Sequence, residues 1–322
     1  MVGYIPYNSK ARRESLSNNA LQENLSKRFR KLLSGDPNGI PPWLEVVSAG
    51  DEAGYFLPTD APWVVHADFG TLVGGIRALL MQALHPGSLT GVKNHSRYEQ
   101  DPLGRLAGTI RWLTVTTFGS KTAVAGEAAR VNRLHERVTG EYKNGSGERV
   151  PYRAADQDLL LWVHIAFMES FLVAHQMYSS REIPKGSFAS GADNYVHQWS
   201  VSVAPLGLTK VPMSEGELEA QISDIYQRGI LVNTDDTLRV VQFIKEPPLP
   251  ASAKPIYRLL FDAAVVSLRP EFRELLGLKA KPRWIIQPLT RFVLRIMRVA
   301  IGPESPIEDG AIARLRRIGV WN

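Results

Sequence analysis

The sequence predicts an all-α protein, a single-domain bundle of roughly 9–12 helices. Apolar residues recur at helical spacing over several long segments, and the sequence contains no series of alternating strands. Capping residues, prolines and glycines separate these segments. The 322 residues, of which 44% are apolar, are ample for one large core.

The expected helices are bounded by their start and stop signals. The segment 69–84 is apolar nearly all round and ends at His85, because the proline that follows disfavours helical geometry in the residue before it. Asp156 is the expected N-cap of a helix over 157–178. The other predicted helices span residues 15–33, 122–139 with Gly140 as C-cap, a segment after the Ser214/Glu217 capping box, 236–245, 256–276 with a break near Pro270, and 283–300.

Three segments have no single helical reading. Residues 105–120 are ambiguous between helix and strand, because a β-branched run competes with an i, i+4 apolar pattern. Residues 141–153 are expected to form a polar loop. Residues 181–213 are rich in glycine and proline, which is typical of an irregular loop or of a lid over a site.

Composition excludes several classes of protein. The chain has no cysteine, which excludes disulfides, thiolate nucleophiles, iron–sulfur clusters and cysteine-ligated zinc or haem. The N-terminal residues carry no apolar run as long as a secretory signal, which predicts a cytoplasmic protein. The segment 158–174 is apolar but short and contains Asp158, His164 and Glu169, which favours a buried helix over a membrane span.

The formal net charge of +6 comes entirely from the C-terminal end. Residues 269–322 carry 11 Lys plus Arg against 5 Asp plus Glu, which leaves 27 against 27 in the rest of the chain. The basic residues are spread through apolar helical sequence over 283–300, which predicts an amphipathic helix whose arginines face water, acidic lipid or a partner. No nucleic-acid-binding motif is found, so no nucleic-acid partner is expected.

The common catalytic signatures are absent, and histidines on apolar helices remain as candidates. The sequence has no GxSxG elbow, P-loop or HExxH helix, and the glycines of GGIR at 74–77 are better explained by close helix packing. His85, His135 and His164 all lie in expected core helices. A buried histidine that is simply hydrogen-bonded is the alternative for each one.

The spacing of the histidines narrows the kind of cofactor. No HxH, HxxxH or ExxH pair is present to form a non-haem iron or zinc site. Haem needs only one imidazole from the protein, together with an apolar cavity and cationic groups for its propionates. Arg105 and Thr109 would share one helix face, where Arg105 could bind a propionate or stabilise a bound oxygen species. The sequence is equally consistent with Arg105 lying in a surface turn without such a role.

Several motifs, in order along the chain, resemble the family of mpaB-type oxygenases and of the catalytic domain of bacterial rubber oxygenase, the latex-clearing protein. They are QALHPGSLTGVKNHSRYEQDPLGRLAGT, LHERVTG and YRAADQDLLLWVH over residues 82–164, with IPPWLE at 40–45 and LRPEFRELLGL at 268–278 as flanking matches. The resemblance divides the chain into an N-terminal helical extension (1–37), a haem-binding oxygenase-like domain (38–300) and a C-terminal tail (301–322).

The resemblance implies a mostly α-helical fold with haem b in a buried pocket. By motif, His135 is the expected iron ligand, and Arg105 and Thr109 are the expected catalytic residues beside it. The resemblance also implies that His164 lies near the cofactor and His85 on its distal side. No residue corresponds to the distal lysine of the polyisoprene enzyme, so polyisoprene is not the expected substrate.

The leading hypothesis is therefore a haem-dependent oxygenase, oxidase or peroxidase-like enzyme. It would use O2 or peroxide on a small or lipid-like intracellular substrate, with electrons from a carrier protein. The alternatives are a haem-binding sensor or carrier without turnover, and a metal-free lipid-binding protein. In each case the basic C-terminal helix offers a possible peripheral membrane contact.

Overall fold

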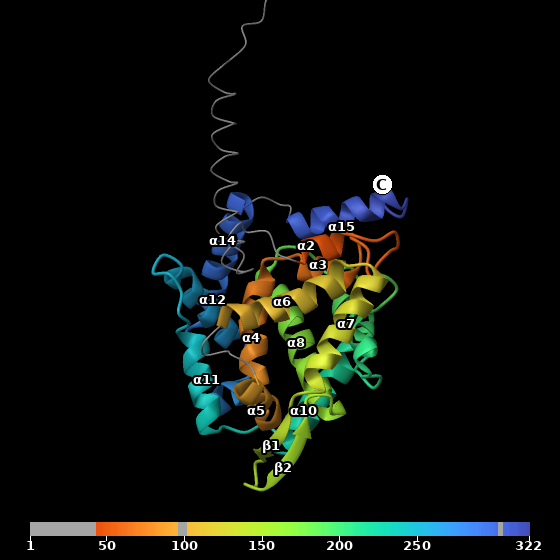
Figure 1. The fold of residues 1–322 in the computed structure, drawn as a ribbon. Helices are drawn as coiled ribbons and strands as arrows, with labels where there is room; N and C mark the ends of the chain where they lie inside the picture. The colour runs from red at the N-terminus through yellow and green to blue at the C-terminus, as the bar shows by residue number, and fades with distance from the viewer. Residues whose placement is uncertain (1–42, 96–101, 302–304) are drawn as a thin grey trace, which may run out of the picture.

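A computed structural model describes residues 43–95, 102–301 and 305–322, and the regular structure of these residues is α-helical apart from one two-stranded hairpin and a short 3-10 helix (Figure 1). The all-α prediction is confirmed. The described residues contain 14 α-helices, more than expected, because several are short and lie in segments without long apolar patterns. The expected helix at 15–33 lies outside the described residues.

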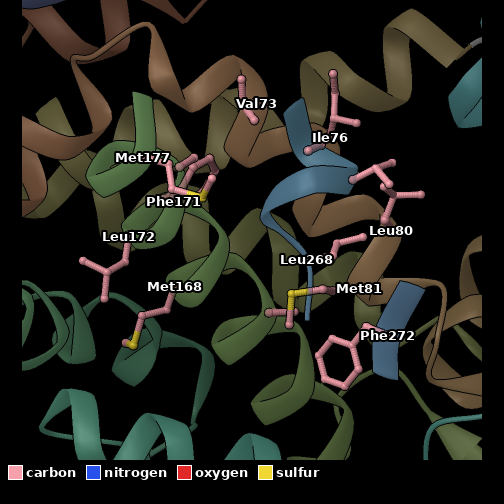
Figure 2. Packing of buried hydrophobic residues seen from close by; sticks show 14 of the residues in the cluster. Val73, Ile76, Leu80, Met81, Met168, Phe171, Leu172, Met177, Leu268 and Phe272 are labelled. Carbon is pink, nitrogen blue, oxygen red and sulfur yellow. The ribbon is translucent and has the colours of Figure 1, made fainter. Parts of the chain in front are cut away.

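Two apolar helices form the centre of the fold, α4 (Gly70–Gln82) and α8 (Gln157–Tyr178). Figure 2 shows side chains of both helices in one core cluster with Leu268 and Phe272. A Cβ on Gly74 would lie 2.7 Å from the Phe171 ring and 3.2 Å from the Ser170 carbonyl oxygen. Glycine is required there because the two helices approach so closely, as the GGIR segment predicts.

The remaining elements surround this pair. Figure 1 shows α11, α12 and α14 on one side of α4 and α7 on the other side of the view, with α6 running across between them. Their bounds are α2 Leu44–Ser48, α3 Ala61–His66, α5 Pro86–His95, α6 Pro102–Phe118, α7 Lys121–His135, β1 Thr139–Lys143, β2 Arg149–Arg153, α9 Gly191–Trp199, the 3-10 helix η1 Ser200–Leu206, α10 Glu215–Gln227, α11 Asp235–Lys245, α12 Lys254–Ser267, α13 Pro270–Leu275, α14 Arg283–Ile301 and α15 Pro306–Arg317.

A second, smaller core lies between α2, α3, α6 and α15. The side chain of Arg314 on α15 is fully buried there and donates hydrogen bonds to the carbonyl oxygens of Val47 and Phe118, the latter at 2.8 Å. The guanidinium therefore ties three segments that are far apart in the sequence. The C-terminal segment after residue 304 is a packed helix rather than an extended tail.

Two loop predictions are wrong. Residues 139–153 form an antiparallel hairpin, with Gly140 paired to Tyr152 in the ladder and not at a helix end. The pattern that indicates these strands is Tyr142, Val150 and Tyr152 alternating with charged residues. Residues 181–213 contain α9 and η1, and α9 begins at an N-cap serine, Ser190, whose hydroxyl accepts from the Asp193 amide at 3.0 Å.

Helix α8 is the segment that passes a length-and-hydropathy test for crossing a membrane among the described residues. In the fold, 72% of its most apolar stretch is buried. It contacts α4, α12, α14 and several other helices. The structure therefore uses α8 as a core helix, as its charged residues predict.

Candidate functional site

Helices α6 and α7 form a helical hairpin that carries the principal candidate residues. The turn between them is only Gly119 and Ser120, and the Ser120 hydroxyl caps α7 by accepting from the Ala123 amide at 3.1 Å. Figure 1 shows the two helices diverging from this turn. The ambiguous segment 105–120 is therefore helical, and tertiary packing overrides the β-branched residues in it.

A buried carboxylate holds the two helices together. Glu127 on α7 is 2% exposed and accepts from Arg111 Nε on α6 at 2.8 Å and from Arg130 Nε at 3.0 Å. Burial raises the pKa of Glu127, but the hydrogen bonds and charges of Arg130 and Arg111 outweigh it and leave the pKa below its usual value. This ionised clamp fixes α7 against α6 midway between the turn and the candidate residues.

Arg105 and Thr109 lie in the first half of α6, at the end of the hairpin away from the turn. Since the segment is a helix, the two residues share one face, as their i, i+4 spacing predicts. Thr109 is partly buried. The side chain of Arg105 lies outside the described residues.

His135 is the last residue of α7, two turns beyond the Glu127 clamp. It is partly buried, whereas the sequence predicts a core position. The buried face of α7 consists of Val124, Glu127 and Ala128 and does not reach the last turn, where Leu134 is 49% exposed. His135 therefore lies where the buried face of α7 gives way to an exposed last turn.

His85 is 4% exposed and its ring has a structural role. Its Nδ1 accepts from the amides of Gly87 and Ser88, at 3.2 and 3.5 Å, and so satisfies the first turn of α5. Burial lowers its pKa to about 4, so the ring is neutral at physiological pH. These contacts favour helix capping over the distal role that the resemblance implies.

His164 on α8 is 5% exposed and has an open coordination position. Among the described residues, no group forms a hydrogen bond with its buried Nε2. Burial lowers the pKa of His164 to about 3, so the ring is neutral. A buried imidazole nitrogen without a partner is costly, which makes this atom a candidate for contact with a bound group.

His66, which the sequence analysis missed, shows the opposite situation. Its Nδ1 and Nε2 lie 2.8 Å from Thr117 Oγ1 and 2.9 Å from the Tyr195 hydroxyl, and its pKa is lowered by burial to about 3. The ring joins α3, α6 and α9. The signal was its place in the apolar run PWVVH.

The donor set in the described residues fits a cofactor held by one imidazole. No group of three or more His, Cys, Asp or Glu in that part of the chain is arranged to hold a metal ion. His135 and His164 lie on different helices, and haem needs only one imidazole from the protein. Two cavities of the described residues are lined by neither histidine nor by Thr109, so neither of them is the buried haem pocket that the sequence predicts.

The larger cavity, of about 680 Å³, lies between α8, α12 and α14 and contains a buried ion-pair network. Arg77, fully buried on α4, donates to Glu169 on α8 and to the Ser170 hydroxyl at 2.9 Å. Arg269 Nη2 binds the other carboxylate oxygen of Glu169 at 3.2 Å and Glu219 at 2.7 Å. The charges compensate one another and hold α4 against α8.

Comparison with protein families decides the class of the protein. Residues 63–300 match the model of the family described as ER-bound oxygenase mpaB/B'/Rubber oxygenase, catalytic domain. The chain belongs to this family. The matched range contains α4 to α8, with Thr109, His135 and His164, so the resemblance predicted from the motifs is confirmed. A search of curated proteins and a search of solved structures each found no match.

Membership in the mpaB/rubber oxygenase family assigns the chain to an oxygenase catalytic domain and supports its being an enzyme. The residues that the family resemblance singles out are carried by the α6–α7 hairpin and by α8. The same matched range also includes nearly all of α14.

Proposed function

We propose that this member of the mpaB/rubber oxygenase family is a haem b-dependent oxygenase that uses O2 or peroxide on a small or lipid-like substrate. The observation that carries the proposal is the α6–α7 hairpin within the matched oxygenase domain. Helix α6 carries Arg105 and Thr109 on one face, and helix α7 ends at His135. The Glu127 clamp joins these two helices.

His135 is the proposed iron ligand. It is partly buried at the end of α7, within the matched oxygenase domain, and one imidazole suffices for haem. The C-terminal end of a helix carries partial negative charge, which increases the electron density at a ring placed there. When bound, the haem would supply the iron at which the oxidant reacts with substrate.

The other residues of the chain orient and shield the reactants. The Thr109 hydroxyl would donate a hydrogen bond to a polar group of the oxidant, and Arg105 would bind an anionic group such as a propionate. His164, neutral and buried, would supply a polar contact within apolar surroundings. The apolar side chains of α4 and α8 would exclude water and favour an apolar substrate.

The absorption spectrum of the purified protein tests the cofactor assignment. Wild type is expected to show a haem Soret band that His135→Ala abolishes, while the matched variant His197→Ala, at an exposed position on α9, retains it. Circular dichroism confirms folding of each variant. Loss of the Soret band in His164→Ala but not in His135→Ala would move the proposed iron ligand to α8. A wild-type protein that binds no haem, even after haem is added to it, would contradict the proposal.

Oxygen consumption separates an oxygenase from a haem carrier. Loaded wild type is expected to consume O2 or peroxide in the presence of an apolar substrate, and Thr109→Val is expected to lose about 10²-fold in rate while haem remains bound. A loaded protein with a normal spectrum and no turnover, across carotenoid, isoprenoid and fatty-acyl substrates, would support the non-catalytic sensor or carrier.

A further inference from the structure

Helix α14 presents a continuous apolar stripe to solvent. Of the 13 large hydrophobic residues that are exposed in the described part of the chain, six lie on this one helix. Trp284 is 78% exposed, Phe292 61% and Val299 73%. The stripe, which consists of Trp284, Ile285, Leu289, Phe292, Ile296 and Val299, follows the helical repeat along one face. A patch of this kind marks an interaction surface.

The opposite face of α14 is fixed to the protein. Ile286 and Leu294 are buried in the main core. Gln287 Nε2 and Arg291 Nε both donate to the carbonyl oxygen of Met177, at 3.1 and 2.7 Å, near the end of α8. The stripe is therefore held in place on the folded domain, so its exposure does not depend on the helix detaching.

The charged side chains of α14 itself are all basic. From Gly277 to Ile301 the sequence contains six Lys or Arg and no Asp or Glu. Arg291, Arg295 and Arg298 follow one another at i, i+4 and i+7, and so form a row along one edge of the stripe. Arg291 and Arg298 also bind the carbonyl oxygen of Met177 and the carboxylate of Asp68, which anchors this edge to the domain, while Arg295 is exposed.

An apolar face beside a row of cations, on a helix that carries no acidic residue, is complementary to the surface of an anionic bilayer. Trp and Phe bury in the boundary between headgroups and acyl chains, while arginines remain at the phosphates. A protein partner would have to supply an apolar groove lined by acidic residues alone. We propose that α14 docks the protein on anionic phospholipid membranes, with the stripe in the headgroup boundary and the arginine row at the phosphates.

Binding of the full chain to vesicles tests this proposal. We expect the protein to float with vesicles of 70% phosphatidylcholine and 30% phosphatidylglycerol, and to float weakly with vesicles of phosphatidylcholine alone. The partition coefficients for the two kinds of vesicle should differ by about tenfold or more, because several cations contribute to binding. Phe292→Ser should lower the partition coefficient about 10- to 100-fold, because one buried aromatic side chain is lost. Arg295→Gln should lower it about fivefold, with the effect shrinking at high salt.

Leu238→Ser is the matched control. Leu238 is 45% exposed on α11, in an apolar position outside the stripe, so this variant should bind vesicles as wild type does. Equal losses in Leu238→Ser and Phe292→Ser would overturn the proposal. So would wild-type binding that is indifferent to anionic lipid.

A single-cysteine probe distinguishes a bilayer from other occupants of the stripe. Because the chain has no cysteine, Ile296→Cys, at a position of the stripe that is 50% exposed, introduces one site for a polarity-sensitive fluorophore and keeps Phe292. We expect fast labelling in the absence of vesicles and a blue shift when anionic vesicles are added. Protection from labelling without vesicles would overturn the proposal. Protection that disappears on dilution would mean that a second copy of the chain covers the stripe. Protection that persists at every protein concentration would mean that residues 1–42 of the same chain cover it.

Discussion

The buried carboxylate at the centre of the fold gives a prediction whose size follows from the structure. Glu169→Gln preserves the shape of the side chain and removes its charge. The Arg77 and Glu169 side chains are only 1% and 4% exposed, so the variant leaves the Arg77 guanidinium buried without a counterion. Breaking a buried pair in this way costs about 3–5 kcal/mol.

The remaining contacts of Arg77 set the expected value at the lower end. Its Nη1 keeps the Ser170 hydroxyl at 2.9 Å, and its Nε keeps the carbonyl oxygen of Ser267 at 3.4 Å. Arg269 retains Glu219. We therefore expect the free energy of unfolding to fall by about 3 kcal/mol. In urea titrations this should lower the midpoint without changing the slope.

The pH dependence has a defined sign. Burial raises the pKa of Glu169, but the charge and hydrogen bonds of Arg77 and Arg269 outweigh it, so the folded-state pKa is below the usual value of 4.5. A depressed carboxyl pKa stabilises the folded state above the unfolded pKa, and this stabilisation is lost as the pH falls through the folded pKa. The difference between wild type and Glu169→Gln should hold from pH 7 to 5 and shrink below pH 4.5.

A double variant tests the reasoning. Replacing both charges, as Arg77→Met with Glu169→Leu, removes the unpaired cation and fills the space with apolar atoms. It should be more stable than Glu169→Gln alone, because apolar replacement of a buried pair is often neutral or stabilising. A loss of less than about 1 kcal/mol in Glu169→Gln, or a double variant at least as unstable as the sum of its single changes, would refute the account.

Three further predictions concern other parts of the fold. Gly74→Ala should lower the free energy of unfolding by about 1–3 kcal/mol, because the added Cβ meets the facing helix α8. Gly75→Ala places its Cβ in open space and should raise the free energy of unfolding by about 0.5–1 kcal/mol. Equal effects of the two variants would contradict this packing. Burial lowers the pKa of His66 and of His164 to about 3, so both rings are neutral in the folded protein. The free energy of unfolding should therefore fall as the pH drops below 6.5, the pKa of histidine in the unfolded chain, by about 1.4 kcal/mol per pH unit for each ring. In His66→Gln, the urea midpoint should depend less steeply on pH than in wild type. Glu127→Gln should lower the free energy of unfolding by about 2 kcal/mol, which is less than for a fully buried pair because Arg111 and Arg130 are about a third exposed. The variant should also exchange the backbone amide hydrogens of α6 and α7 faster. Unchanged amide exchange would argue against the clamp.

Residue periodicity alone located the long helices. The apolar segments predicted at 69–84, 157–178 and 283–300 appear as α4, α8 and α14, because a long helix buries a stripe that is written in its own sequence. The break at Pro270 separates α12 from α13 for the same local reason. The ordered motifs at 82–164 likewise sufficed to indicate the oxygenase family.

The lone charges of two apolar helices were a readable signal that was used only in part. Arg77 is the single charged residue of the segment 69–84, and Glu169 lies near the middle of 158–174. Two opposite charges in buried helices are expected to pair, because an unpaired buried charge is costly. The sequence nevertheless does not specify which helices face each other.

Contacts between distant segments were decided only by the tertiary structure. Periodicity placed His135 on an apolar stripe, but burial depends on which helices cover that turn, and none covers it fully. The same amphipathic pattern in α14 could have been buried on both faces, yet the fold covers one side and leaves Trp284 and Phe292 exposed. Sequence fixes which face of a helix is apolar, whereas the neighbouring elements in space determine whether that face meets protein or the surroundings.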